Sequence, residues 1–454
     1  MGQRTIVIVG GGASGTCVAI NLARLAAASL RIVVIEPRAE LGLGPAYSTP
    51  YWSHLLNVRA GNMSALADHA AHFFRWLQKS YPSDVAADSF VPRPLYGRYL
   101  RETLAEVLRD KPLVNVEHRR DQAARVDPSG SGCEVTLTGG TQLSAGQVVL
   151  ALGNESPRNP IPITAGVEVF SSWASAAYKG LASDVPVLLI GSGLTAVDAV
   201  LALNEEGHRG LIYVISRHGK WPLIHGDPAP PISFPRPEDL HTVRSLMRQL
   251  RSIAREREQA GDNWRTAVDS IRPHTGGIWT RLSITERRRF LRHGRWLWDI
   301  HRHRMAGEVG AKLAAIRDCG RLKTFAGRVI EAGTNDGSLA RVRLGLRNGG
   351  EMVLDVGRII NCTGPAGDLA DSSNPVLRNL IRSGAGTADQ MRLGLVTNEH
   401  GALIAADGST SNTIFTLGPP RRGMLWESVA MPEIRVQARA LAQSLLEIRS
   451  PRLD

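Results

Sequence analysis

Cysteine is scarce in this sequence, and no two cysteines lie close together. The 454 residues include 4 cysteines, at positions 17, 133, 319 and 362. Because no CxxC spacing occurs, neither a zinc site nor a redox-active disulfide is predicted, which argues against the disulfide reductases among flavoproteins. His301 and His303 are spaced i, i+2, which does not place two ligands on one face of a helix. We therefore expect no metal site.

Long apolar runs are also missing. No stretch approaches the ~18 apolar residues that a membrane span requires. The apolar start of the chain is interrupted by Gly10, Gly11 and Gly12, which does not resemble a secretory signal. We expect a soluble, cytoplasmic protein without a membrane partner.

Acidic residues are outnumbered by basic ones, which gives a formal net charge of +12. The basic residues are scattered, with one dense run at 286–304, and no nucleic-acid-binding motif accompanies them. The charge is therefore attributed to anionic cofactors and a small anionic substrate rather than to nucleic acid.

A glycine-rich turn follows the first apolar run, residues 5–9, which is typical of a buried strand. A helix is predicted from Cys17 to Leu25, and a second strand over 31–35 ends at Glu36. Glycines at this turn allow a tight bend, close approach of the backbone to a pyrophosphate and close helix–strand packing, while the acid accepts ribose hydroxyls. The pattern predicts an FAD site formed by Gly10, Gly12, Ser14, Gly15 and Glu36.

The same pattern begins again at residues 187–198, and a further strand is predicted over 211–215. Its turn carries Gly191, Gly193, Thr195 and Ala196, and its strand ends at Arg217 instead of an acid. The third glycine serves packing, so alanine adds only a methyl group there. We expect this site to bind NADPH or NADH, with Arg217 favouring the 2′-phosphate of NADPH.

The two predicted nucleotide-binding units also end in the same way, with a strand that runs into a glycine. The predicted strands over 147–153 and 358–364 run into Gly153 and Gly364, where backbone can approach a cofactor. A third such segment, 412–418, ends at Gly418 and precedes a predicted helix over 426–446. The N-terminus of that helix is expected to face the flavin and to stabilise negative charge there.

The sequence thus predicts an α/β fold with two Rossmann-like dinucleotide-binding domains. The first segment of the FAD domain covers 1–165, the NAD(P) domain covers 180–365 with a helical insertion at about 236–305, and residues 366–454 return to the FAD domain. Within the insertion, the run 286–304 is read mainly as a solvated helix with an aromatic stripe. Arg302 and Arg304 are the candidates there for contact with an anionic substrate or with the NADP phosphate.

Several motifs make the chain resemble a bacterial group of two-dinucleotide-domain flavoprotein monooxygenases. These motifs are 42–47 (GLGPAY), 54–60 (HLLNVRA), 190–195 (IGSGLT), 298–304 (WDIHRHR) and the pair Trp426-Glu427. The group includes an FAD-dependent urate hydroxylase and a nitrosuccinate-forming aspartate N-monooxygenase. The resemblance implies that Asn57 lies near the reactive face of the flavin and that Glu427 belongs to the FAD site.

The resemblance also implies a reaction. Reduced FAD and molecular oxygen would form a C4a-hydroperoxide that donates a hydroxyl group, and urate, giving 5-hydroxyisourate, is the expected substrate. Two alternatives stay open: N-hydroxylation of an amine or amino acid, and an electron-transfer reductase or redox sensor. A carboxylate clamp with a nearby acid for the ammonium group is not identified in the sequence.

Overall fold

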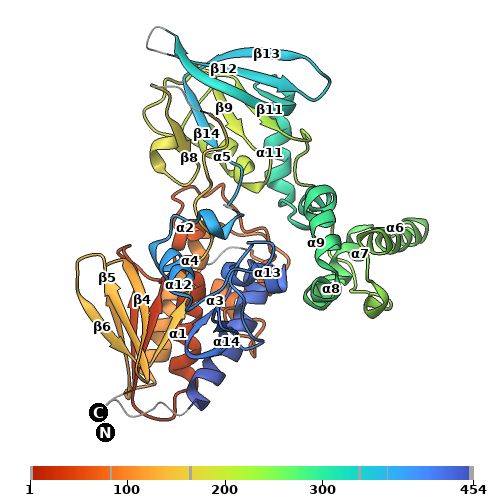
Figure 1. Cartoon of the computed structure of the whole chain (residues 1–454). Helices are drawn as coiled ribbons and strands as arrows, with labels where there is room; N and C mark the ends of the chain where they lie inside the picture. The colour runs from red at the N-terminus through yellow and green to blue at the C-terminus, as the bar shows by residue number, and fades with distance from the viewer. Residues whose placement is uncertain (1–3, 82–83, 163–165, 336–338, 366, 449–454) are drawn as a thin grey trace.

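The computed structural model describes residues 4–81, 84–162, 166–335, 339–365 and 367–448. These residues form two sheet-centred units and a helical arm that projects to one side (Figure 1). Among the helices in these ranges, none is both long and apolar enough to cross a membrane.

The first sheet consists of six strands: β1 (Arg4–Val9), β2 (Leu30–Ile35), β3 (Val114–Arg119), β7 (Gln147–Leu150), β15 (Ala402–Ile404) and β16 (Thr410–Thr416). The strand order is β15-β16-β7-β1-β2-β3, parallel except for β15. Strand β16 pairs with β7 in the register Ile414 to Val148, so the C-terminal segment returns to the sheet that the N-terminus begins.

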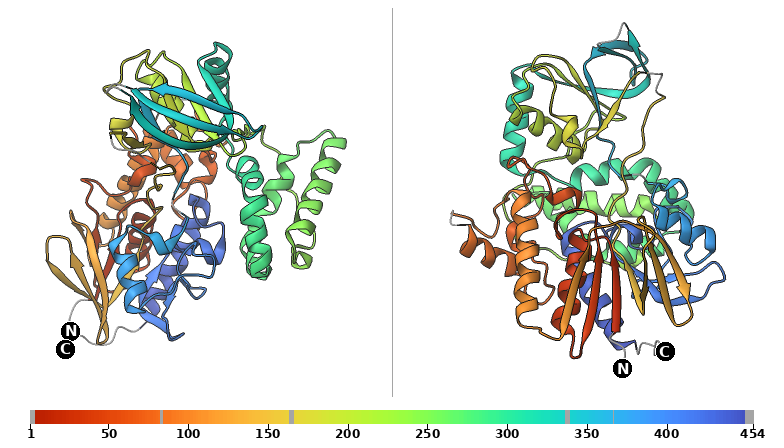
Figure 2. Two further views of the ribbon diagram at one scale, coloured as in Figure 1. Left: turned by 45° about the horizontal axis from the view of Figure 1, so that its top comes forward. Right: turned by 90° about the vertical axis from the view of Figure 1, so that its left-hand side faces the viewer.

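Both faces of the first sheet are covered, because successive side chains of a strand point to opposite faces. Ile6 and Ile8 pack beneath helices, whereas Val7 and Val9 belong to the core on the other face. The helices on the first face are α1 (Ala13–Leu25), α4 (Arg93–Arg109) and α14 (Met431–Glu447); the other face carries α12 (Pro375–Ser383) and the small sheet of β4 (Ala123–Ser129), β5 (Gly132–Leu137) and β6 (Gln142–Ala145). Figure 2 shows this layering.

The second sheet has seven strands: β8 (Val169–Ser171), β9 (Val187–Ile190), β10 (Ile212–Ser216), β11 (Leu322–Asn335), β12 (Leu339–Leu346), β13 (Glu351–Val356) and β14 (Arg358–Asn361). Their order is β13-β12-β11-β10-β9-β14-β8. The sheet already includes Val169, ahead of the boundary at residue 180 that the sequence suggests. Helices α5 (Leu194–Glu205) and α11 (Gly307–Asp318) pack on one face.

The helical arm lies between β10 and α11. It contains α6 (Val243–Gln259), α7 (Arg265–Ser270), α8 (Thr275–Arg281), α9 (Ile284–Arg289), the π-helical turn η5 (Phe290–Gly294) and α10 (Arg295–Arg302). Its core extends to the C-terminal segment, where the rings of Trp279 and Trp426 stack with centroids 4.9 Å apart. The arm is thereby anchored on the first unit.

Three predicted helices differ from the observed ones. Helix α1 begins at Ala13 instead of Cys17, because it starts directly after its N-cap, Gly12. The C-terminal helix begins at Met431 instead of Trp426, because Trp426 has a φ of 58° and Pro432 is tolerated only in the first turn. The segment 286–304 is interrupted by η5, and its last arginines are buried, so it is not one solvated helix.

Candidate functional site

A cavity of about 520 Å³ lies between the first glycine turn and the start of α5, the helix that follows the second turn. From the first unit it is lined by Gly10, Gly12, Ser14, Glu36, the 43–51 loop, Gly153 and Asn154; from the second by Leu194, Thr195 and Asp198. Two nucleotide-binding turns that open on one cavity can bring the reactive ends of two cofactors together.

The first glycine turn is packed too tightly for side chains. Gly10 has a φ of 101°, and a Cβ atom there would lie 2.4 Å from the carbonyl oxygen of Ala151. A Cβ atom on Gly15 would lie 1.9 Å from the carbonyl oxygen of Gly10. Gly12 is the N-cap of α1 and no side chain caps it, so the N–H groups of the first turn are available to a phosphate.

Glu36 lies at the end of β2, buried beside this turn. Its carboxylate accepts hydrogen bonds from the backbone N–H groups of Gly11 at 3.0 Å and Arg38 at 3.1 Å. The Arg38 guanidinium forms an ion pair with it at 3.0 Å. The carboxylate is held in one position at the cavity wall, where it suits a ribose diol.

The second turn repeats the geometry of the first, except that an alanine replaces the third glycine. Gly191 has a φ of 109°, and a Cβ atom on it would lie 2.4 Å from the carbonyl oxygen of Cys362. Gly193 is the uncapped N-cap of α5, and a Cβ atom on it would meet open space. Ala196, fully buried, occupies the place of the third glycine.

Arg217 follows β10 and is exposed. The neighbouring His218 ring stacks on Trp296 of the helical arm, with centroids 4.3 Å apart, and its Nδ1 accepts a hydrogen bond from Arg347 at 2.9 Å. The pKa of His218 is lowered by burial and then by Arg347 and Arg217. Cations therefore gather where a 2′-phosphate is expected.

Two side chains at the cavity wall join the units. Arg93 at the start of α4 donates to both carboxylate oxygens of Asp198 on α5, at 2.6 and 3.1 Å. His54 Nε2 lies 2.9 Å from the carbonyl oxygen of Asp198, and its Nδ1 lies 2.8 Å from the Thr49 hydroxyl. Sequence reasoning missed Arg93 as a site residue because nothing near it in the chain marks it.

The N-terminus of α14 also lines the cavity, through Val429, Met431 and Ile434. Gly418, which precedes it, donates its N–H to the Gln437 side chain at 3.0 Å. A Cβ atom on Gly418 would lie 3.4 Å from the Ser14 hydroxyl of the first turn. The C-terminal segment is therefore part of the first cofactor site.

Asn57 is half-buried and is not among the residues that line the cavity. Its carbonyl oxygen lies 3.1 Å from His225 Nε2, and the His225 ring lies 4.8 Å from that of Phe90. The structure thus brings Asn57 beside the helical arm, a neighbourhood that its position in the sequence does not reveal.

The two buried arginines of the arm have different partners. Arg302 donates to Glu427 at 3.2 Å, and Glu427 also accepts from the Trp298 indole at 3.1 Å. Glu427 therefore links the arm to the C-terminal segment, a contact that accounts for its burial without a flavin. Arg304 instead forms an ion pair with Asp269 on α7.

The three buried cysteines are poorly suited to thiol chemistry, and the exposed Cys319 is not among the residues that line the cavity. None forms a disulfide, and three of the four are buried. Burial raises the pKa of Cys17, at the first turn, to about 12 and that of Cys133 to about 11. Because the thiolate is the reactive form, these thiols are unreactive at neutral pH. In the described ranges, no cluster of three or more His, Cys, Asp or Glu side chains suited to a metal occurs.

Comparisons with known proteins agree with this geometry. Residues 7–155 match the family model described as FAD-NAD(P)-binding. No sequence among the curated proteins matches the chain. An ornithine hydroxylase from Pseudomonas aeruginosa has a similar fold, with a TM-score of 0.67 at 14% identity, covering 98% of this chain and 99% of that one.

Two further solved structures share the architecture. L-lysine 6-monooxygenase from Pseudomonas syringae has a TM-score of 0.63 at 16% identity. Bacillithiol disulfide reductase from Staphylococcus aureus has a TM-score of 0.58 at 13% identity. In both cases the match covers 98% of this chain and 99% of the other. These structures confirm the two-dinucleotide-binding flavoprotein fold. The family model, described as FAD-NAD(P)-binding, agrees with the expected cofactors FAD and NAD(P)H.

Proposed function

We propose that this protein is a flavin-dependent monooxygenase that N-hydroxylates a small amine or amino acid, with NADPH as electron donor. The observation that carries the proposal is the cavity lined by the first glycine turn and by Leu194 and Thr195, which directly follow the second turn. Bound there, reduced FAD and oxygen supply the hydroxyl group, while the chain holds and orients the reactants. Gly10, Gly12, Gly15 and Glu36 would hold FAD, and Gly191, Gly193 and Thr195 would hold the nicotinamide donor.

The structural relatives favour this reaction over the hydroxylation of urate that the sequence resemblance implies. Two of them are named as an ornithine hydroxylase and a lysine monooxygenase, and each aligns over nearly the whole chain. None of the structures compared above is named as acting on a purine. We therefore place N-hydroxylation first and retain urate as a compound to be tested.

A disulfide reductase is less well supported, although one relative carries that name. The chain has no CxxC pair, and Cys17 beside the first turn is buried with a raised pKa. A reductase of this kind requires a thiol that reaches its substrate as thiolate.

The test is a coupled assay on FAD-loaded protein. NADPH oxidation, oxygen uptake, hydrogen peroxide and hydroxylamine are measured with L-ornithine, L-lysine, L-aspartate and urate in turn. We expect an amino acid to raise oxygen uptake with an equal yield of hydroxylamine and little peroxide, because a bound substrate intercepts the oxidant. Coupled removal of urate without any hydroxylamine would contradict the proposal.

A further inference from the structure

A cluster of cations lies outside the cavity wall, between the Asn57 loop and the helical arm. Its most buried member is Arg304, whose side chain is 4% exposed. One terminal nitrogen of Arg304 donates to Asp269, while Nε and Nη1 have no hydrogen-bond partner among the described residues. Buried guanidinium nitrogens without partners are costly, so this side chain is suited to an additional acceptor.

A second arginine reaches the same place from α7. Arg265 Nε donates to the carbonyl oxygen of Ile224 at 2.8 Å. Arg265 lies four residues before Asp269 on α7, so it shares one face of that helix with the ion-pair partner of Arg304. The pKa of Arg265 is lowered by burial and then by the charge of Arg304. An anion held by both arginines would offset the repulsion between the two cations.

The cluster is continuous with the loop that carries Asn57. His225 follows Ile224, the residue that Arg265 contacts, and its backbone N–H donates to the carbonyl oxygen of Met305, next to Arg304. Its Nε2 lies near the Asn57 carbonyl oxygen. Its pKa is lowered to about 4 by burial and then by Arg304, so the imidazole is neutral at pH 7. Arg59, from the first unit, donates to the carbonyl oxygen of Gly226. Residues of the first unit and of the arm thus meet at one place, where Arg304 and Arg59 also have the acidic partners Asp269 and Asp88.

We propose that Arg304 and Arg265 form a subsite that binds the carboxylate of an amino-acid substrate. This inference rests on the proposed N-hydroxylation and adds a substrate class to it. A guanidinium group is the side chain best matched to a carboxylate. Asp269, which is half-exposed and pairs with Arg304, supplies the acid that an ammonium group requires nearby. The subsite therefore selects amino acids over simple amines.

The experiment measures equilibrium binding, which does not depend on turnover. FAD-loaded protein is titrated calorimetrically with L-ornithine, L-lysine and L-aspartate, and with putrescine and cadaverine, which lack the carboxylate. We expect at least one amino acid to bind about ten-fold or more tightly than the diamines. If no amino acid binds, or if the amino acids and diamines bind equally, the subsite is overturned.

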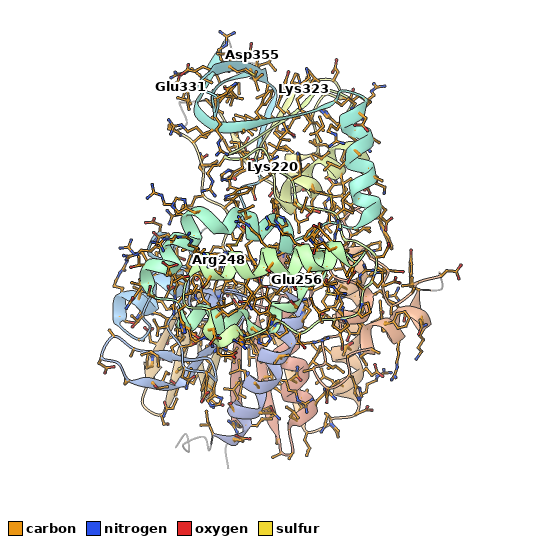
Figure 3. All side chains as sticks on the ribbon, turned by 90° about the vertical axis from the view of Figure 1, so that its right-hand side faces the viewer. Lys220, Arg248, Glu256, Lys323, Glu331 and Asp355 are labelled. Carbon is orange, nitrogen blue, oxygen red and sulfur yellow. The ribbon has the colours of Figure 1, made fainter. Side chains whose placement is uncertain are left out.

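Substitutions show which arginine side chains bind the carboxylate. Arg304→Met should weaken binding of the amino acid by about 10–100-fold, since a charge-assisted hydrogen bond is lost, and Arg304→Lys should restore part of it. Arg265→Met, at a more exposed position, should give a smaller loss and serves if Arg304→Met does not fold. The matched control is Arg248→Met, on the outer helix α6 (Figure 3), which should bind as the wild type does.

These outcomes separate the subsite from the proposed reaction. Arg304→Met that binds the amino acid as tightly as Arg248→Met overturns the subsite, whatever the enzyme produces. Tight binding that depends on Arg304, together with an absence of hydroxylamine, leaves the subsite in place and rejects N-hydroxylation.

Discussion

The two glycine turns have nearly the same backbone but different surroundings. Gly10 and Gly191 both have a positive φ, and at each a Cβ atom would meet a carbonyl oxygen at 2.4 Å. The first turn is enclosed, because α1 packs against α4 and α14, and Glu36 is buried beside it. The second ends at the exposed Arg217. An enclosed site suits a cofactor that stays bound, whereas an open one suits a donor that must leave after each turnover.

Bulky substitutions at the helix N-caps of the two turns should have the largest effects, and these effects should differ between the turns. Gly12→Val directs a branched side chain into the cavity wall, so we expect purified protein with almost no flavin absorbance. Gly193→Val, in open space at the second turn, should keep the flavin and lose its reduction by NADPH. Flavin absorbance and anaerobic reduction measure the two effects. Full flavin content in Gly12→Val would mean that the first turn is not the FAD site.

A methyl group at the third position should destabilise the protein at the first turn and stabilise it at the second. Gly15→Ala places a Cβ atom 1.9 Å from a backbone oxygen, so α1 must shift, at a cost of about 2–4 kcal/mol in the free energy of unfolding. Ala196→Gly leaves a small void and a poorer helix former, at about 1–2 kcal/mol. Urea unfolding compares the variants. A gain in stability for Ala196→Gly, or no loss for Gly15→Ala, would contradict this difference in packing.

Removal of Arg217 should distinguish the donors. Arg217→Ala is expected to raise the KM for NADPH by about 10–100-fold, because a charge-assisted contact of ~1.5–3 kcal/mol is lost. The KM for NADH, which lacks the 2′-phosphate, should change little. Steady-state kinetics with both donors provides the measurement, and a similar rise for both donors would place Arg217 away from the phosphate.

The pair Arg93–Asp198 should give the smallest effect. Its side chains are 18% and 20% exposed, so solvent screens part of the attraction. A double-mutant cycle of Arg93→Met and Asp198→Asn should give a coupling energy of about 1 kcal/mol in unfolding. A coupling near zero would mean that packing, and not this ion pair, holds the two units together.

Local pattern was sufficient to predict the two units. A glycine turn requires its residues within a short stretch, so the strands, the glycines and Glu36 can be predicted from residue order, and the structure has them in that order along the chain. The first helix begins at Ala13, four residues before the predicted start at Cys17. The start of the C-terminal helix was predicted five residues too early. The backbone at Trp426 has a φ of 58°, which a helix does not allow, and the Trp426 ring stacks on Trp279 of the distant arm.

The sequence by itself determined the fold class, the two cofactors and the residues of each turn, because those features depend on neighbours in the chain. Only the tertiary structure decided which side chains share a site. Arg93 and Asp198 are 105 residues apart, and Asn57 and His225 are 168 apart. Arg302 and Arg304 stand two positions apart yet have different partners, Glu427 and Asp269. No spacing rule links such residues, since their distances are set by how the two units and the arm pack against one another.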